Sequence, residues 1–228
     1  MASTAPADFR MGAAAPSRTL GVVKLYLSSF RLGTRASDLG RMVAGGKRIG
    51  VVRNALDFSS DKDRLEQGRA REFDELKDIG LTPEELDLRR FFAAPTGLEE
   101  TLARLDALWV VGGNTFVLRR AMSQSGLERA LMSRSDDPAF VYAGYSAGAC
   151  VMGPTLRGLH LVDDPIAVPA GYSDATVWEG LSFVPFAIAP HYRSLHPESG
   201  LNENVIDYFI ENKVPFITLR DGEVYLKE

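Results

Sequence analysis

The chain has 228 residues, of which 45% are hydrophobic and 25% charged, and its formal net charge at pH 7 is −4. These values are typical of one globular domain that is long enough to bury a sizeable core. Lysine and arginine are scattered singly, so the sequence has no basic patch of the kind that binds nucleic acid or a membrane surface. No run of about 18 apolar residues occurs, which argues against a membrane-spanning helix. Chemistry on a small molecule or a peptide is therefore favoured.

Short β-branched or aromatic runs alternate along the chain with helical patterns. The predicted strands are residues 21–27, 48–52, 86–91, 107–111, 140–143, 183–189, 216–219 and 224–226. The predicted helices are residues 36–44, 62–78, 98–105, 115–132 and 203–212, and the second of these is charged nearly all round, as on a surface helix. Residues 81–85, "LTPEE", are interpreted as a turn or cap. This alternation predicts an α/β three-layer sandwich with a mostly parallel central sheet.

The N-terminal segment and the cysteine content indicate the extent of the folded domain and the compartment of the protein. Residues 1–18 are rich in Ala and Pro but lack the continuous apolar segment of a secretory signal, so we predict a disordered tail. Residues 19–228 are expected to form a single domain. Cys150 is the only cysteine, which rules out an intrachain disulfide and favours a reducing compartment.

The stretch "VYAGYSAGACVM", residues 141–152, contains the pattern G-x-S-x-G at 144–148, between a predicted strand and a short Ala-rich segment. A serine at such a sharp turn has a strained backbone, and its neighbours must be small so that the chain segments can approach. This turn, the nucleophile elbow, exposes the Ser146 hydroxyl at the carboxyl edge of the sheet and directs the Ala147 N–H toward an oxyanion. We predict that Ser146 is a nucleophile; the alternative is a serine that only caps the helix.

A second glycine turn follows the predicted strand at 107–111. Gly112, Gly113 and Asn114 separate this strand from a predicted helix, so free backbone N–H groups are expected at the same edge of the sheet. Two such turns can build one oxyanion hole. Alternatively, this turn is a phosphate cradle or a plain tight loop. It does not match a dinucleotide-binding fingerprint, because that pattern needs a third glycine.

A serine nucleophile needs a base, and the chain has three histidines. His191 follows the apolar run "FVPFAIAP", at the end of a predicted strand, where open α/β sheets bind their ligands. His160 and His196 lie in irregular segments. By position His191 is favoured over His160, and His160 over His196.

The base in turn needs a carboxylate that fixes its tautomer and stabilises the imidazolium. Asp221 in "TLRDGEVY" directly follows another predicted strand, although Asp-Gly between two apolar runs is also a hairpin signal. The rival acids are Asp163, Asp164 and Glu223.

Five motifs occur in a characteristic order: "LYLSSF" at 25–30, "GGNTF" at 112–116, "GYSAGA" at 144–149, "PHY" at 190–192 and "LRDG" at 219–222. From about residue 22 onward, this order resembles that of the peptidase E family of serine-dependent aspartyl dipeptidases. The resemblance implies a flavodoxin-like fold, similar to that of class I glutamine amidotransferases.

The resemblance also implies roles for individual residues. Ser146 would be the nucleophile, His191 the base and Asp221 the acid, where the best-known members have glutamate in a "PEG" turn. The oxyanion hole would come from the backbone of Gly113 and Ala147. The implied protein is a cytoplasmic enzyme without a metal or other cofactor, acting on short peptides. We expect a monomer or homodimer.

The chain departs from the family at the substrate-binding helix. Peptidase E has an arginine in a "TREQRI"-like helix start that is thought to clamp the substrate's aspartyl carboxylate, whereas residues 201–206 here read "LNENVI". An asparagine cannot supply the bidentate, charge-assisted pair, which leaves specificity for N-terminal Asp open. The candidate substrate-binding residues are Asn114, Arg193 and Asn202, and Arg157 is a further cation, although a surface role is favoured for both arginines. The chain ends soon after Asp221, as in the shorter members of the family.

The favoured function is hydrolysis of short peptides through an acyl-enzyme on Ser146. The alternatives are an amidase or esterase on the same scaffold, because the triad does not determine the leaving group, and a non-catalytic homologue that binds a ligand near Ser146. A cysteine hydrolase is disfavoured because Cys150 lies four residues past Ser146, where it is expected to pack in the core. Glutaminase chemistry is disfavoured because the related amidotransferases have cysteine at the elbow.

Overall fold

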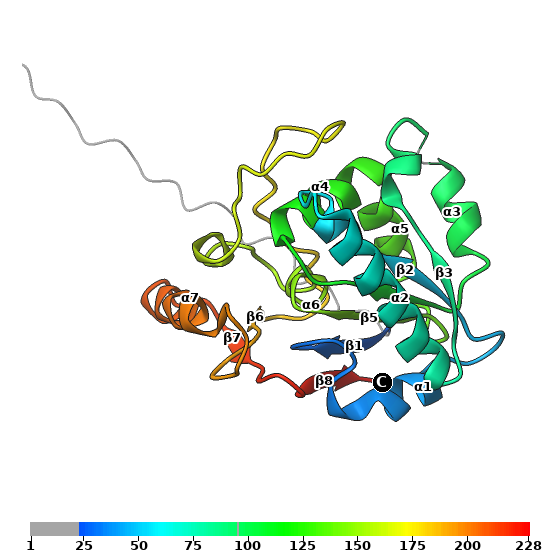
Figure 1. Cartoon of the computed structure of the whole chain (residues 1–228), viewed down its shortest axis with the longest axis horizontal. Coiled ribbons are helices and arrows are strands. Elements are labelled where there is room, and N and C mark those ends of the chain that lie inside the picture. The colour runs from blue at the N-terminus through cyan, green and yellow to red at the C-terminus, as the bar shows by residue number, and fades with distance from the viewer. Residues whose placement is uncertain (1–22, 95) are drawn as a thin grey trace, which may run out of the picture.

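A computed structural model of the chain describes residues 23–94 and 96–228, and the predicted tail lies outside the described residues. The described strands of the central sheet lie in the order β3-β2-β4-β5-β1-β8 (Figure 1). Their bounds are β1 Lys24–Ser28, β2 Arg48–Val52, β3 Thr82–Glu85, β4 Ala107–Val110, β5 Val141–Tyr145 and β8 Val224–Lys227. All pairs are parallel except β1 with β8. The predicted α/β class with a mostly parallel central sheet is therefore confirmed.

Strand side chains alternate between two cores, one on each face of this sheet. On β4, Leu108 and Val110 join one cluster while Ala107 and Trp109 join the other. The first cluster packs against α3 Thr96–Leu102, α4 Thr115–Ser125, α5 Leu127–Ser133 and α6 Ala147–Cys150. The second packs against α1 Ala36–Met42 and α2 Lys62–Asp78. This alternation with period two gives the three layers of the sandwich.

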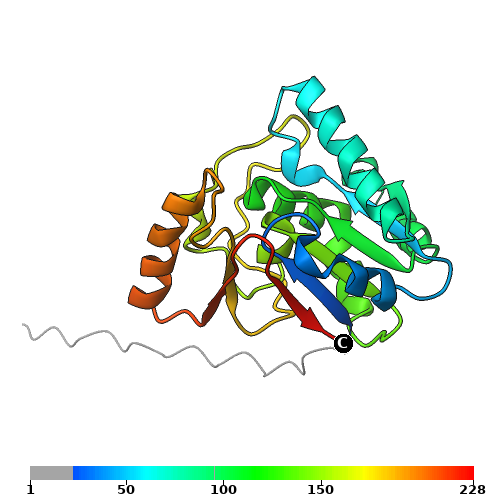
Figure 2. The same cartoon turned by 60° about the horizontal axis from the view of Figure 1, so that its bottom comes forward.

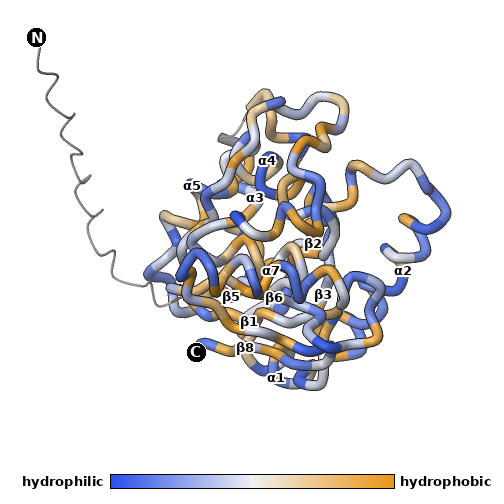
Figure 3. The backbone as a smooth tube through the Cα atoms, turned by 90° about the vertical axis from the view of Figure 1, so that its left-hand side faces the viewer, coloured by the Kyte–Doolittle hydropathy of each residue, from blue (hydrophilic) through white to orange (hydrophobic). Residues whose placement is uncertain are grey.

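Helix α2 is hydrophilic along most of its length (Figure 3) and buries only Glu72 and Leu76. The buried Glu72 carboxylate accepts hydrogen bonds from Trp109 Nε1 at 2.7 Å and from the Tyr145 hydroxyl at 2.8 Å. The surface helix predicted from the charge pattern is therefore present. The Glu72 carboxylate links this helix to Tyr145, the residue that precedes Ser146.

A second, two-stranded sheet stands apart from the central one. It pairs β6 Ala187–Ala189 in parallel with β7 Phe216–Thr218, and α7 Ser199–Glu211 connects the two strands. Figure 2 shows α7 and these strands on the opposite side of the molecule from α2. The hairpin signal at Asp-Gly was misleading, because β7 pairs with β6 while β8 pairs with β1.

Of the predicted elements, one strand is shorter than expected, one helix is broken and two helices are displaced. The strand expected at 183–189 is shorter, because the N–H groups of Phe183 and Val184 both donate to the Met152 carbonyl and do not enter a ladder. The helix expected at 115–132 is broken at Gly126, whose φ of +81° ends α4 and starts α5. The helices expected at 98–105 and 203–212 are α3 and α7, displaced by a few residues.

The strand expected at 86–91 is instead a 3-10 helix, η3 Leu88–Phe91, and the strand lies just before it. Asp87 caps η3 by accepting the Arg89 N–H, and Asn54 Oδ1 accepts the Leu88 N–H, so these backbone groups are not available to a sheet. The proline that suggested a turn, Pro83, is tolerated because β3 is an edge strand. Among the described helices, none has the length and apolar character needed to cross a membrane.

Candidate active site

Ser146 occupies the junction between β5 and α6 with φ of 49° and ψ of −116°, a backbone conformation that is strained for a residue with a side chain. Within 141–150 it is the one residue that is not buried. Its hydroxyl makes no capping hydrogen bond to α6, so the helix-cap alternative does not describe this serine. A side chain at Gly148 would lie 2.1 Å from the Val110 carbonyl, so only glycine lets α6 pack this closely on β4.

His191 faces Ser146 from the small second sheet. It follows β6, is 1% exposed and has a positive φ of 57°. Its Nε2 lies 3.1 Å from Ser146 Oγ, and its Nδ1 lies 2.7 Å from Asp221 Oδ1. With the ring proton on Nδ1, the imidazole donates to the carboxylate and accepts from the serine hydroxyl, which is the arrangement a general base requires.

Asp221 follows β7, the parallel partner of β6, so the His191 and Asp221 segments leave the same end of one two-stranded sheet. The rival acids bind elsewhere: Asp163 accepts the Thr115 N–H, Asp164 the Ile166 N–H and Glu223 the Arg220 N–H. His160 packs its ring against Trp178 and Tyr208. Of the predicted bases and acids, the structure brings His191 and Asp221 to Ser146.

Ser29 is a residue of this site that the sequence reasoning missed. It follows β1, and its hydroxyl donates to Asp221 Oδ1 at 2.9 Å while accepting the backbone N–H of His191 at 2.8 Å. The Ser194 hydroxyl in turn accepts the Asp221 N–H at 2.8 Å. Two serines therefore hold the histidine backbone and the aspartate loop in register. The signals for Ser29 were its place at the end of a buried strand and within the motif "LYLSSF" at 25–30, to which no role was assigned.

The surroundings of His191 lower its pKa, chiefly through burial and further through the neighbouring His196, while Asp221 acts in the opposite direction. The His196 ring stacks on His191 with centroids 3.7 Å apart and planes 11° apart. Phe30 contacts both histidine rings and Tyr145 through edge or tilted contacts at 5.5 to 6.0 Å. His191 is therefore neutral at neutral pH, the form in which it can accept a proton.

The Gly112-Gly113 turn lies against the elbow. A Cβ at Gly112 would lie 2.9 Å from Ser146 Cβ, and one at Gly113, whose φ is +140°, would lie 2.5 Å from the Ala55 carbonyl. Asn114 N donates to that carbonyl. Within the described chain, neither the Gly113 N–H nor the Ala147 N–H has a hydrogen-bond partner. One unpaired donor therefore comes from the residue after Ser146, and the other from a turn that packs against Ser146.

The three residues expected to bind substrate have other partners. Asn114 caps α4 through the N–H groups of Phe116 and Val117 and donates to the Asp164 carbonyl. Asn202 is buried and donates to the Glu198 carbonyl. Arg193 is exposed and lies 3.5 Å from Glu203, as expected of a surface charge. Arg157, the further cation, lies over the Trp178 ring.

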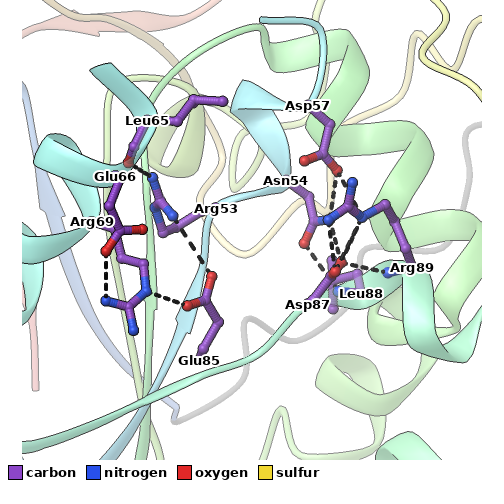
Figure 4. Close-up of polar contacts among 10 residues, drawn as sticks. All are labelled: Arg53, Asn54, Asp57, Leu65, Glu66, Arg69, Glu85, Asp87, Leu88 and Arg89. Carbon is purple, nitrogen blue, oxygen red and sulfur yellow. Dashed lines mark hydrogen bonds and ion pairs between the residues drawn. The ribbon is translucent and has the colours of Figure 1, made fainter. Parts of the chain in front are cut away.

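A cavity of about 200 Å³ opens at the carboxyl ends of β2 and β3. Figure 4 shows polar residues that line it, among them Arg53, Asp87 and Arg89. Arg53 donates to the Leu65 carbonyl and lies 3.6 Å from Glu85, and Arg89 pairs with Asp87 and Asp57. Arg53 Nε is buried without an acceptor among the described residues. Both arginines are committed to acidic neighbours, so the cavity does not offer the missing bidentate clamp.

Cys150 is buried on α6, where its thiol contacts the Ile188 carbonyl at 3.4 Å and burial raises its pKa well above the ordinary value. A buried neutral thiol is not a nucleophile, so the expectation of a packing role is confirmed.

An α/β fold whose elbow serine faces a histidine is typical of the serine hydrolase class. Residues 60–226 match the model of peptidase family S51, and the chain belongs to that family. Peptidase E of Streptomyces coelicolor is 37% identical over 131 residues, 54% of this chain and 50% of the relative. A Drosophila melanogaster protein described as a probable alpha-aspartyl dipeptidase is 33% identical over 132 residues, again 54% and 50%. The chain thus spans about half the length of these two relatives. The resemblance to the peptidase E family is confirmed.

Two solved structures share the fold. A candidate peptidase E from Listeria monocytogenes superposes with a TM-score of 0.69 at 22% identity, covering 90% of this chain and 98% of that one. A peptidase from an acI-B1 actinobacterium gives 0.63 at 14% identity, covering 92% and 84%.

Proposed function

We propose that the protein is a serine-dependent peptidase that hydrolyses short peptides, with Ser146, His191 and Asp221 as its catalytic triad. The proposal is carried by one observation, the hydrogen-bond chain from the Ser146 hydroxyl through the His191 ring to the Asp221 carboxylate. Membership of family S51 and the names of the relatives favour a dipeptidase. The lowered pKa of His191 supports its role as a base at neutral pH.

In the first step, His191 Nε2 takes the Ser146 proton as the oxygen attacks the scissile carbonyl carbon. The C–N bond then breaks, the amine leaves with the proton that His191 returns, and an acyl-enzyme ester remains on Ser146. Water, deprotonated by His191, cleaves this ester and releases the acid. Asp221 keeps the ring proton on Nδ1 and stabilises the imidazolium in both halves of the reaction.

The backbone donors of Gly113 and Ala147 are the proposed oxyanion hole. Both N–H groups lack a hydrogen-bond partner among the described residues, and both belong to turns next to Ser146, which supports this role. Donors of this kind stabilise the tetrahedral intermediate because they are already oriented before charge develops on the oxygen.

We expect this enzyme to accept peptides without an N-terminal aspartate. Asn202 stands where the resemblance implies the clamping arginine, and its side chain is buried against the Glu198 carbonyl. The nearest arginine after the histidine, Arg193, is paired with Glu203 on the surface. Without an available cation, a substrate carboxylate gains no charge-assisted pair.

The test combines active-site labelling with turnover. A fluorophosphonate probe is expected to modify the wild-type protein at Ser146, mapped by mass spectrometry, and to leave Ser146→Ala unmodified; Ser133→Ala, a change on α5, should label like wild type. The same three proteins are then assayed on Asp-X dipeptides, other dipeptides and simple esters. Peptide turnover that persists in Ser146→Ala would overturn the proposal. Turnover of esters alone would select an esterase.

A further inference from the structure

We propose that His191, His196 and Glu198 form a site for a divalent transition metal ion such as Zn²⁺, and that the bound ion reversibly inhibits the enzyme. One ligand atom from each residue lies within 4.8 Å of the other two. Two imidazole nitrogens and one carboxylate oxygen, with a fourth position left open, are a ligand set that Zn²⁺ commonly takes. The inhibitory part rests on the proposed function, whereas the binding part does not.

One of the ligand–ligand distances is already close to that of a tetrahedral site, and the others are within 4.8 Å. Zinc ligands at about 2.0–2.2 Å from the ion lie roughly 3.3–3.6 Å from one another. His196 Nδ1 lies 3.8 Å from Glu198 Oε2, so this pair already has nearly that separation. Both side chains are partly exposed, on the loop between β6 and α7, and can adjust toward the buried and fixed His191.

His191 is oriented as metal-binding histidines are. Its Nδ1 donates to the Asp221 carboxylate, so the lone pair available to an ion is on Nε2. A carboxylate behind the ring fixes the tautomer and raises the basicity of the metal-bound nitrogen. The same lone pair is the one that would accept the Ser146 proton, 3.1 Å away.

Glu198 has no lysine or arginine partner among the described residues. His196 is the one basic side chain within ion-pair range of its carboxylate. A dication bound by the two imidazoles would therefore supply a positive charge beside the Glu198 carboxylate.

Binding requires one rearrangement. An imidazole nitrogen binds an ion in the plane of its ring, and the two histidine rings are parallel and stacked 3.7 Å apart. His196 must therefore turn out of the stack, exchanging its 3.3 Å contact with the Glu198 N–H for the metal. The bound ion would occupy the His191 lone pair next to the Ser146 hydroxyl and block the first step of catalysis.

The test uses the full chain without a histidine tag, in a buffer that does not chelate metal. Titration calorimetry with ZnCl₂ is expected to give one ion per chain, and Zn²⁺ should abolish peptide turnover and fluorophosphonate labelling until EDTA is added. Glu198→Gln should retain basal turnover. Both Glu198→Gln and His196→Phe, which keeps a ring on His191, should bind zinc at least about 10-fold more weakly. Glu203→Gln, on the neighbouring helix α7, should match wild type.

The outcomes separate this inference from the proposed function. Absence of saturable zinc binding to the wild type, or equal affinity in Glu198→Gln and His196→Phe, would overturn the metal site even in an active peptidase. Calorimetric binding that the two variants lose would support the site even if no peptide were hydrolysed, and Co²⁺ absorption bands of a tetrahedral site would identify the ligand geometry. Zinc binding that leaves turnover unchanged would overturn the inhibitory part.

Discussion

Ser29 and Asp221 are 192 positions apart in the chain, yet the Ser29 hydroxyl donates a 2.9 Å hydrogen bond to the Asp221 carboxylate. The same hydroxyl accepts the His191 N–H, so one side chain at the end of β1 holds two members of the proposed triad. Because the Ser29 hydroxyl hydrogen-bonds to Asp221 and His191 and not to Ser146, we regard Ser29 as a positioning residue.

Ser29→Ala is therefore expected to lower kcat about 10-fold or more while leaving KM nearly unchanged. The variant removes a donor to Asp221 and leaves the buried His191 N–H without an acceptor, which should loosen the orientation of the ring. Steady-state kinetics with Thr34→Val as the matched control would measure this, because Thr34 contacts only the Gly222 carbonyl in the same turn. A change in KM alone would argue for substrate binding by Ser29.

The activity should persist to lower pH than an ordinary histidine allows. Burial lowers the pKa of His191, so the base stays deprotonated below its usual value of about 6.5 and kcat/KM falls only as pH drops through the lowered pKa. A profile from pH 4.5 to 8.5 is expected to show an acid limb with its midpoint below 6.5. A midpoint above 6.5 would mean that the attraction of Asp221 outweighs burial.

Asp163→Asn should change how stability depends on pH. Burial raises the pKa of Asp163 to about 6, above the value of about 3.9 expected in the unfolded chain. Because the pKa is raised on folding, the Asp163 carboxyl contributes fully to the free energy of unfolding below pH 4, and this contribution is lost as pH rises through 6. At pH 7.5 the variant should be more stable than wild type by about 1–3 kcal/mol, and at pH 4 it should gain nothing.

Denaturant unfolding at the two pH values would measure this difference. Asp164→Asn is the matched control, because Asp164 is its exposed neighbour and accepts only the Ile166 N–H. Equal gains at both pH values would show that the effect of Asp163→Asn does not come from titration.

Glu72→Ala should lower the free energy of unfolding by about 2–4 kcal/mol. The change leaves the buried Trp109 N–H and Tyr145 O–H without an acceptor, and each unpaired buried donor is unfavourable by about 1–3 kcal/mol. Asp74→Ala on the same helix, which removes an exposed pair with Lys77, should change stability by less than about 1 kcal/mol. Urea unfolding of both variants measures the two changes in the free energy of unfolding. Equal losses in the two variants would contradict the role of the Glu72 hydrogen bonds.

Features that depend on neighbouring residues could be predicted from the chain alone. The apolar runs at β2 and β4 indicated buried strands, and the small residues around Ser146 predicted the sharp turn after β5. Predictions were wrong where one local pattern is compatible with two structures. A proline such as Pro83 occurs both in turns and in edge strands, and here it lies in an edge strand. Short apolar runs such as 86–91 do not distinguish a strand from a 3-10 helix, because the outcome depends on which distant groups accept the backbone N–H groups.

The sequence by itself determined the class of fold. It also predicted a sharp turn at Ser146 and a histidine and an aspartate that follow strands, because periodicity and small residues act over a few neighbouring positions. Only the tertiary structure decided which side chains meet. The pairing of β6 with β7 brings His191 beside Asp221, β1 delivers Ser29 to both, and a loop stacks His196 on the histidine ring. The order of strands is set by how all the elements bury their faces together, which no single segment encodes.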